Sequence, residues 1–254
     1  MKRILFGITT LIFLSGCSFY SPKDVNPINT NLTYTNHDSI LIEIYAKQFQ
    51  WTVRYSGKDN ILGDVNTGCI GPNNELGIIS RTTIENQIDS INNVIEVLNQ
   101  RKEIKQAHDN LNLKREQLVS QKSQLNTYLL ATSEGQLNAA TDDIVTKELH
   151  LPVGKQILFK FRSQDVIHSA YIPHFKLQMN CVPGVSTQFS FIPTKTTQEI
   201  KKELNNDSFE YFMICNKICG EGHYNMRMKV VVETEEKYNE WLEIQAYEKS
   251  PGLN

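Results

Sequence analysis

The chain has 254 residues, with 26 basic and 28 acidic side chains and a formal net charge of −2. This length allows one generous domain, or one domain that carries an insertion. The content of 40% hydrophobic and 21% charged residues is that of an ordinary globular protein. The sequence contains no basic patch and no glycine-rich phosphate loop, so no nucleic-acid partner is expected.

Residues 1–17 have the pattern of a bacterial export signal. A basic start precedes the apolar run 4–14, and the letters LSGC, which end at Cys17, resemble a lipobox, whose cysteine becomes the lipidated first residue. The run is shorter than the roughly 20 residues that a transmembrane helix needs. We expect lipidation at Cys17, with an ordinary cleaved signal or a short uncleaved anchor as alternatives. Residues 18–36, rich in Ser, Pro, Asn and Thr, are expected to form a flexible tether.

Residues 37–77 are expected to begin a β domain. SILIEIYAK (39–47) is strongly β-prone, and FQWTVRY (49–55) alternates apolar with polar side chains, which is the period-two pattern of a half-buried strand. SGKDN (56–60) has turn chemistry, and GCIGPNNELG (68–77) has that of a loop. This part of the domain therefore contributes two strands.

Residues 78–131 are expected to form an α-helical insertion. Proline and glycine are absent from 80–130, and apolar residues recur at coiled-coil spacing. The two seams are Ile84, Ile88, Ile91, Ile95 and Leu98, then Ile104, Ala107, Leu111, Leu118 and Leu125. The phase breaks between Leu98 and Ile104, which favours two helices, folded back as a hairpin or bent at the break, over one long helix with a stutter. No catalytic grouping of side chains occurs here, so the insertion is a structural or docking element.

Residues 132–248 return to β patterns and end in a helix. Short β-prone segments occur at 144–149, 156–162, 185–191, 209–214 and 226–233. TEEKYNEWLEIQAYE (234–248) is amphipathic, and the acids of its first turn suit a helix N-terminus. Many short strands separated by turn signals predict a mainly β fold, a β-sandwich or small barrel.

Two cysteines, a histidine and a methionine fall within CNKICGEGHYNM (215–226). The spacing of Cys215 and Cys219 permits a disulfide in an oxidising compartment, and zinc would accept both with His223 and a second histidine. Zinc has no use for the thioether of Met226, whereas thiolate, imidazole and thioether together select copper. A blue-copper site needs one cysteine; two favour a pair of thiolates that bridge two coppers, each capped by one histidine. The second histidine must come from elsewhere in the chain.

Candidates for this second histidine occur throughout the sequence. His168, in SQDVIHSAYIP, follows an acid by three residues, and His174 is six residues further on. His37, His108 and His150 lie in the tether, the helical insertion and a predicted strand. Taken singly, each is more typical of a surface or core histidine than of a metal ligand.

DVIHSAYIP, VPG and CNKICGEGHYNM together resemble the copper-binding domain of cytochrome c oxidase subunit II, and AKQFQWTVRY resembles the aromatic strand of that family. The resemblance covers about residues 39–62 and 144–246. It implies a cupredoxin-like Greek-key β-sandwich or barrel that holds a binuclear copper centre, CuA. Carried over by position, the ligands are His168, Cys215, the backbone carbonyl of Lys217, Cys219, His223 and Met226.

Several features depart from the family pattern. The family usually begins with two transmembrane helices, for which an acyl anchor at Cys17 would substitute. A glutamate that helps to hold magnesium commonly lies between the two cysteines, but Lys217 occupies its place, so we predict no magnesium ligand there. Phe49 stands where the family has the tryptophan that receives electrons, and Trp51 matches the second aromatic residue. The helical insertion is not a family feature.

The resemblance implies the electron-transfer subunit of a haem-copper oxidase, which accepts electrons from cytochrome c or a similar donor through CuA and passes them to the catalytic subunit, where oxygen is reduced. A stand-alone CuA electron carrier, or a copper-handling lipoprotein without an oxidase partner, is the alternative. The expected location is the bacterial cell envelope, lipid-anchored at the outer, periplasmic face of the cytoplasmic membrane. Cys69 and Cys181 lie outside the motif, and either form a disulfide or remain buried free thiols.

Overall fold

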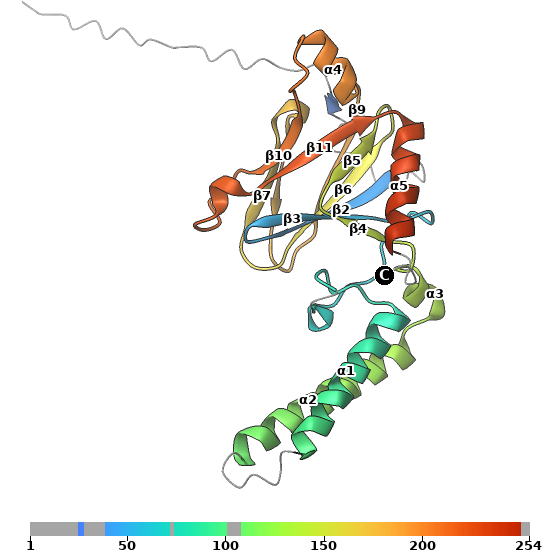
Figure 1. Cartoon of the computed structure of the whole chain (residues 1–254), viewed down its shortest axis with the longest axis vertical. Helices are drawn as coiled ribbons and strands as arrows, with labels where there is room; N and C mark the ends of the chain where they lie inside the picture. Colours follow the sequence, from blue (N-terminus) through green and yellow to red (C-terminus); the bar gives the residue numbers. More distant parts are fainter. Residues whose placement is uncertain (1–24, 28–38, 72–73, 101–107, 250–254) are drawn as a thin grey trace, which may run out of the picture.

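The computed structural model describes residues 25–27, 39–71, 74–100 and 108–249. In these parts of the chain, a six-stranded and a five-stranded sheet pack face to face, and a helical hairpin projects from the sandwich (Figure 1). The six-stranded sheet consists, in spatial order, of β1 (Val25–Pro27), β9 (Thr187–Pro193), β6 (Ile157–Ser163), β2 (Ile40–Lys47), β3 (Gln50–Tyr55) and β4 (Ile144–Thr146). The five-stranded sheet consists of β5 (Leu149–Pro152), β11 (Arg227–Glu233), β10 (Tyr211–Cys215), β7 (His168–Ile172) and β8 (Leu177–Cys181).

The inner faces of the two sheets form one hydrophobic core. Strand β6 shows why: its residues alternate between buried and half-buried positions, and Ile157, Phe159 and Phe161 on its inner face are fully buried. Phe191 of β9 and Tyr211 of β10 are also fully buried in this core, so both sheets contribute to it. Burying one such side chain contributes about 1.5–3 kcal/mol. The predicted mainly β sandwich with a C-terminal helix is confirmed.

Three further helices and several 3-10 turns lie outside the two sheets. They are α3 (Glu134–Asn138), α4 (Thr197–Glu203) and α5 (Glu235–Lys249), with 3-10 turns η1 (Thr67–Cys69), η3 (Pro173–Phe175) and η4 (His223–Asn225). The C-terminal helix α5 is held by aromatic contacts: Trp241 stacks on His150 with ring centroids 4.0 Å apart, and meets Tyr55 edge-on at 5.3 Å.

The helical insertion folds back on itself as an antiparallel hairpin of α1 (Arg81–Gln100) and α2 (His108–Ala131) (Figure 1). The predicted seam of α1 faces its partner, because Ile84, Ile91 and Leu98 are buried. On α2 the predicted seam is half-buried. Of the two arrangements left open by the sequence, the structure has the hairpin; Ile104 and Ala107 lie outside the described residues.

The base of the hairpin has a small core of its own. Cys69, Ile79, Ile84 and Leu137 are buried together, and Ile88, Leu125, Tyr128 and Leu129 pack against them. These residues come from the loop before α1, from both helices and from α3. This second cluster is separate from the main core and packs the hairpin against the loop before α1 and against α3.

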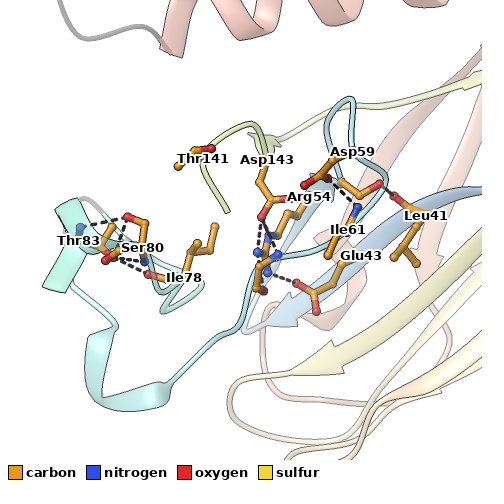
Figure 2. A network of polar contacts seen from close by, with 12 residues as sticks. Leu41, Glu43, Arg54, Asp59, Ile61, Ile78, Ser80, Thr83, Thr141 and Asp143 are labelled. Carbon is orange, nitrogen blue, oxygen red and sulfur yellow. Dashed lines mark hydrogen bonds and ion pairs between the residues drawn. The ribbon is translucent and has the colours of Figure 1, made fainter. Parts of the chain in front are cut away.

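A buried arginine on the outer face of β3 holds both ends of the insertion (Figure 2). Arg54 is 1% exposed; its Nε donates to Asp143 Oδ2 at 2.9 Å, and its Nη2 donates to the carbonyl of Gly63 at 2.7 Å. Gly63 N also donates to Asp143 Oδ2, at 3.1 Å. Glu43 of β2 lies 3.5 Å from Arg54 Nη1 and pairs with Arg162 of β6. Gly63 precedes the hairpin and Asp143 follows it, so one side chain fixes both connections to the sheet.

Three local features differ from the sequence-based expectations. The single strand predicted at 144–149 is two strands, because β4 pairs with β3 in one sheet and β5 pairs with β11 in the other. Strands β7 and β8 were not predicted. Within the expected tether, Val25–Pro27 form β1, which pairs with β9. No helix in the described part of the chain has the length and apolar character of a membrane span.

Candidate metal centre

The residues of the motif lie at one end of the sandwich, where the loop from β10 to β11 projects (left in Figure 1). Cys215 is the last residue of β10, and His168 is the first of β7. These strands are antiparallel, with Cys215 opposite Ala170, two residues from His168. Because side chains alternate along a strand, Cys215 and His168 point to the same face. Strand pairing therefore brings together two residues that are 47 positions apart.

Cys215 is the centre of one half of the cluster. Its Sγ lies 3.8 Å from Nδ1 of His168, 3.2 Å from the carbonyl oxygen of Lys217 and 3.9 Å from Sγ of Cys219. His168 is fully buried, and Cys215 and Cys219 are each 7% exposed. His168, Cys215 and Cys219 have ligand atoms close enough to hold one metal ion together.

Cys219 is the centre of the other half. Its Sγ lies 3.6 Å from Nδ1 of His223 and 3.9 Å from Sδ of Met226. The 3-10 turn η4 carries His223, and Met226 follows it at 1% exposure. All six residues expected as ligands from the sequence thus lie in one cluster, with one histidine beside each thiol.

The donor set fits a pair of copper ions. The Sγ–Sγ separation of 3.9 Å is far longer than the ~2.05 Å of a disulfide, and both thiols are free. Two sulfurs that share a metal at ~2.3 Å each, the zinc–sulfur value, lie at most ~4.6 Å apart, so this separation allows bridging. Thiolates, imidazoles and a thioether are the ligands that select copper.

Asp165 fixes the orientation of His168. Its Oδ1 lies 2.8 Å from Nε2 of His168, which leaves Nδ1 directed at Cys215. Burial disfavours the charged carboxylate, but hydrogen bonds from the backbone N–H groups of Gln48 and Val166 and from His168 hold the pKa of Asp165 below its ordinary value. The carboxylate therefore stays charged and keeps the imidazole in the tautomer that a metal requires.

The thiol of Cys219 is protonated in the metal-free protein. Burial, followed by the neighbouring charge of Cys215, raises the pKa of Cys219 to about 11. Metal ions bind the thiolate, so binding here would release protons.

The two aromatic residues singled out from the sequence occupy different depths. Phe49 is 38% exposed, whereas Trp51 is 2% exposed. Trp51 Nε1 donates to the carbonyl of Met226 at 3.4 Å, and its ring meets that of His168 at 6.2 Å, inclined by 63°. Trp51 therefore contacts the cluster from inside the core, and Phe49 lies at the surface against Gly220 and Gly222 of the loop.

His150 and His174 lie away from the cluster. His150 is held between Glu233 and Trp241, and His174 packs against Phe209 and Tyr211. His37 and Cys17 lie outside the described residues, and the side chain of His108 is not described.

Cys69 and Cys181 are both free and buried, the first in the small core of the hairpin and the second in the main core. The sequence left open a disulfide between them or two buried free thiols. In the structure both are free thiols.

Sequence reasoning missed one residue of the site. Gln48, in the turn between β2 and β3, donates from its Nε2 to the carbonyl of Cys219 and from its backbone N–H to Asp165 Oδ2, at 2.7 Å. Its partners are 171 and 117 positions away. A local pattern in the sequence carries no signal for such contacts.

A β-sandwich that gathers two cysteines, two histidines and a methionine at one end defines a cupredoxin-like domain. Residues 113–234 match the family described as cytochrome C oxidase subunit II, periplasmic domain, and this part of the chain belongs to that family. Residues 1–18 match the prokaryotic membrane lipoprotein lipid attachment site. The attachment site and the periplasmic domain together support a membrane-anchored location on the periplasmic side.

Relatives with curated names agree with this assignment. The alternative cytochrome c oxidase subunit 2 of Bradyrhizobium diazoefficiens is 30% identical over 210 residues, which cover 82% of this chain and 52% of that protein. Cytochrome c oxidase subunit 2 of Thermostichus vulcanus is 37% identical over 98 residues, or 39% of this chain and 26% of that protein. The chain thus spans about half or less of the length of these relatives.

Among solved structures, the periplasmic domain of subunit II of cytochrome oxidase (CoxB) of Bradyrhizobium japonicum aligns with a TM-score of 0.43 and 15% identity, covering 85% of this chain and 99% of that one.

Proposed function

We propose that this chain is the electron-transfer subunit of a haem-copper oxidase, and that its cluster holds a binuclear CuA centre. The observation that carries the proposal is the pair of buried thiols 3.9 Å apart, each with one histidine Nδ1 beside it. The assignment of the chain to a family of oxidase subunits rests on the family match. The partner, the donor and the two-copper centre are the parts that we propose.

Each ligand has a defined task in this proposal. Cys215 and Cys219 would bridge the two metals, and His168 and His223 would each cap one. Met226 and the carbonyl of Lys217 would complete the two coordination spheres as weak axial donors. When bound, such a centre supplies a one-electron carrier whose charge is spread over two metals.

The protein around the cluster suits electron transfer better than substrate chemistry. The bridging sulfurs, His168 and Met226 are almost completely buried, so water and substrate have little access to them. The donor atoms already lie near one another in the metal-free chain, and a carboxylate holds His168 in place. Little rearrangement is then needed when an electron arrives or leaves.

Electron input is proposed to pass through the aromatic pair. Phe49 is accessible to a donor at the surface, and Trp51, two residues further along the chain and buried, contacts both His168 and the carbonyl of Met226. Cytochrome c or a similar protein would deliver the electron, and the catalytic subunit of the oxidase would receive it and reduce oxygen.

We propose further that β1 with residues 37–77 and 132–248 form the cupredoxin domain, that 78–131 is an insertion and that the chain between an acylated Cys17 and β1 is a tether. The domain would then sit at the outer face of the cytoplasmic membrane. One acyl chain binds a bilayer only marginally, with a constant of ~10⁴ M⁻¹, so Cys17 would carry more than one. If the anchor is as proposed, Cys17→Ala transfers the protein to the soluble fraction or blocks its processing. Retention after a carbonate wash would place the anchor elsewhere.

Purification of the full chain from its native membrane tests the central proposal. A tagged chain is expected to bring a haem-containing oxidase subunit with it, and the preparation is expected to consume oxygen with reduced cytochrome c. Isolation of the copper-loaded chain alone, without haem, would instead favour a stand-alone carrier.

A further inference from the structure

The turn between β2 and β3 lies against the loop that carries two of the ligands. Gln48 and Phe49 form this turn, because Lys47 and Gln50 are the last paired residues of the two strands. The loop, residues 216–225, runs from Cys215 to Met226 and contains Cys219 and His223. Gln48 Nε2 donates to the carbonyl of Cys219. The turn thus contacts the backbone of a ligand directly.

Two glycines in the loop show how closely the turn and the loop approach each other. Gly220 has φ = 146°, and a Cβ built there would lie 2.8 Å from Gln48 Nε2 and 2.9 Å from the ring of Phe49. A Cβ on Gly222 would lie 2.5 Å from the ring of Phe49. Real Cβ atoms do not approach other heavy atoms this closely, so a side chain at either position would force the loop or the side chains of Gln48 and Phe49 to shift.

The same turn also reaches the other half of the cluster. The backbone N–H of Gln48 donates to Asp165 Oδ2 at 2.7 Å, and Asp165 Oδ1 lies 2.8 Å from Nε2 of His168. His168 belongs to β7, whereas Cys219 belongs to the loop after β10. Gln48 therefore forms hydrogen bonds both to the backbone of Cys219 and to Asp165, which contacts His168. Cys219 and His168 belong to different parts of the fold.

The turn is well placed to act as a fixed support. Strand β2 pairs with β3 on one side and with β6 on the other, up to Ala46 opposite Ser163. Gln164 N donates to the carbonyl of Ala46 at 2.9 Å, which extends the pairing to the edge of the turn. The loop, in contrast, has one 3-10 turn and no strand pairing of its own.

We propose that Gln48 is a positioning residue of the metal centre, which holds the loop with Cys219 and His223 through its side chain and the Asp165–His168 pair through its backbone. It contributes no donor atom to the metal. The inference rests on the proposed copper site, but part of its test requires no metal.

The test compares Gln48→Leu with the matched variant Gln50→Leu. Gln50 lies two residues away, and its side chain bonds to Glu75, 3.4 Å away, instead of to the loop. The Gln48→Leu variant keeps the backbone N–H at this position and thus the bond to Asp165, so it removes only the side-chain contact with Cys219. In the metal-free protein, Gln48→Leu is expected to speed amide hydrogen exchange within 216–225, and Gln50→Leu is expected to leave it unchanged.

Copper provides the second readout. After loading, Gln48→Leu is expected to lose copper to a chelator about 10–100-fold more readily than the parent, the range typical when a group that orients ligands is removed. The electron paramagnetic resonance pattern should change at an unaltered melting temperature. Equal exchange rates and equal copper release in the two variants would overturn the inference. A parent that takes up no copper would refute the proposed function, while the exchange data would still decide the role of Gln48.

Discussion

The Sγ atoms of Cys215 and Cys219 lie 3.9 Å apart in the buried end of the sandwich. Their partners are arranged alike: Nδ1 of His168 is 3.8 Å from the first sulfur, and Nδ1 of His223 is 3.6 Å from the second. A mononuclear blue-copper site would use one thiol and leave the other buried without a metal. The pairwise arrangement therefore favours two metals, which gives the first prediction.

Copper reconstitution of the metal-free chain is expected to give about two copper ions per chain and a purple, mixed-valence spectrum. Cys215→Ser or Cys219→Ser should abolish the delocalised signal, because a serine hydroxyl does not replace a bridging thiolate. Cys69→Ser is the matched control, since this buried free thiol belongs to the small core of the hairpin. Metal analysis and electron paramagnetic resonance measure both quantities. A single copper per chain, or zinc bound tightly in place of copper, would contradict the binuclear site.

Met226→Leu is expected to keep both coppers and to raise the reduction potential by tens of millivolts. Its Sδ lies 3.9 Å from Cys219 Sγ, at 1% exposure, and a weak axial thioether tunes the potential more than it holds the metal. Removing an electron donor favours the reduced state, hence the sign. Met213→Leu, in the main core, is the control and should leave the potential unchanged. Spectroelectrochemical titration distinguishes the two, and loss of copper in Met226→Leu would show that the thioether is an essential ligand.

Arg54→Met is expected to destabilise the fold by about 3–5 kcal/mol, because it leaves the carboxylate of Asp143 buried without its cation. The side chains of Arg54 and Asp143 are 1% and 0% exposed. Lys155→Met is the control: it removes an ion pair with Glu235 whose side chains are 44% and 50% exposed, and it should cost less than ~1 kcal/mol. Urea unfolding gives both values. Similar losses of unfolding free energy in the two variants would mean that the buried ion pair stabilises the fold no more than the exposed one.

The stabilising effect of Glu75 is expected to depend on pH. Burial disfavours its charge, but the hydrogen bond and charge of Lys147, with Lys47 and Thr52, hold the pKa of Glu75 below its ordinary value. A carboxyl group with a lowered folded-state pKa stabilises the fold above its unfolded pKa of about 4.3 and loses this effect as the pH falls through the folded value. Glu75→Gln should therefore be less stable than the parent at pH 7, and the difference should shrink on acidification. A difference that is constant between pH 7 and pH 3 would contradict this linkage.

The proximity of the proposed ligands in the loop could be predicted because these residues are close together along the chain. Cys215, Cys219, His223 and Met226 lie within twelve letters, and their spacing alone indicates soft-metal chemistry. His168 was assignable only through the family resemblance, because its approach to Cys215 depends on the pairing of β7 with β10. Both β7 and β8 were missed: their segments HSAYI and LQMNC lack a clear period, and each becomes a strand through its neighbours.

The contacts that position the site and the hairpin were not predictable for the same reason. Gln48 reaches a backbone carbonyl 171 residues away, and Arg54 pairs with Asp143 across 89 residues. Neither pair has a local periodicity or a motif. The seam of the hairpin, in contrast, follows from spacing alone, and the structure buries Ile84, Ile91 and Leu98 as expected.

The hairpin is expected to be dispensable for copper binding, but its base is not expected to be dispensable for stability. All the proposed ligands lie beyond residue 160, whereas the small core contains Cys69 and Leu137, which flank the hairpin. Two truncations separate these roles. Lys122 Nζ bonds to Asn92 Oδ1 at 2.7 Å, so a short Gly/Ser linker in place of residues 93–121 can join these neighbours and keep the base. The longer truncation joins Gly77 to Ala131 and removes most of the base.

Both truncated chains are expected to fold, because the free energy of closing a loop depends only weakly on its length. The copper spectrum of each should match that of the parent. The shorter truncation should leave the sandwich at nearly the parent's stability, whereas the longer one should lose about 1.5–3 kcal/mol for each large apolar side chain, such as Leu137, that it uncovers. Loss of copper in the shorter truncation would show that the hairpin belongs to the metal domain. If copper remains but electron delivery to the oxidase falls, the hairpin is a docking element; if delivery also remains, it is a passive spacer.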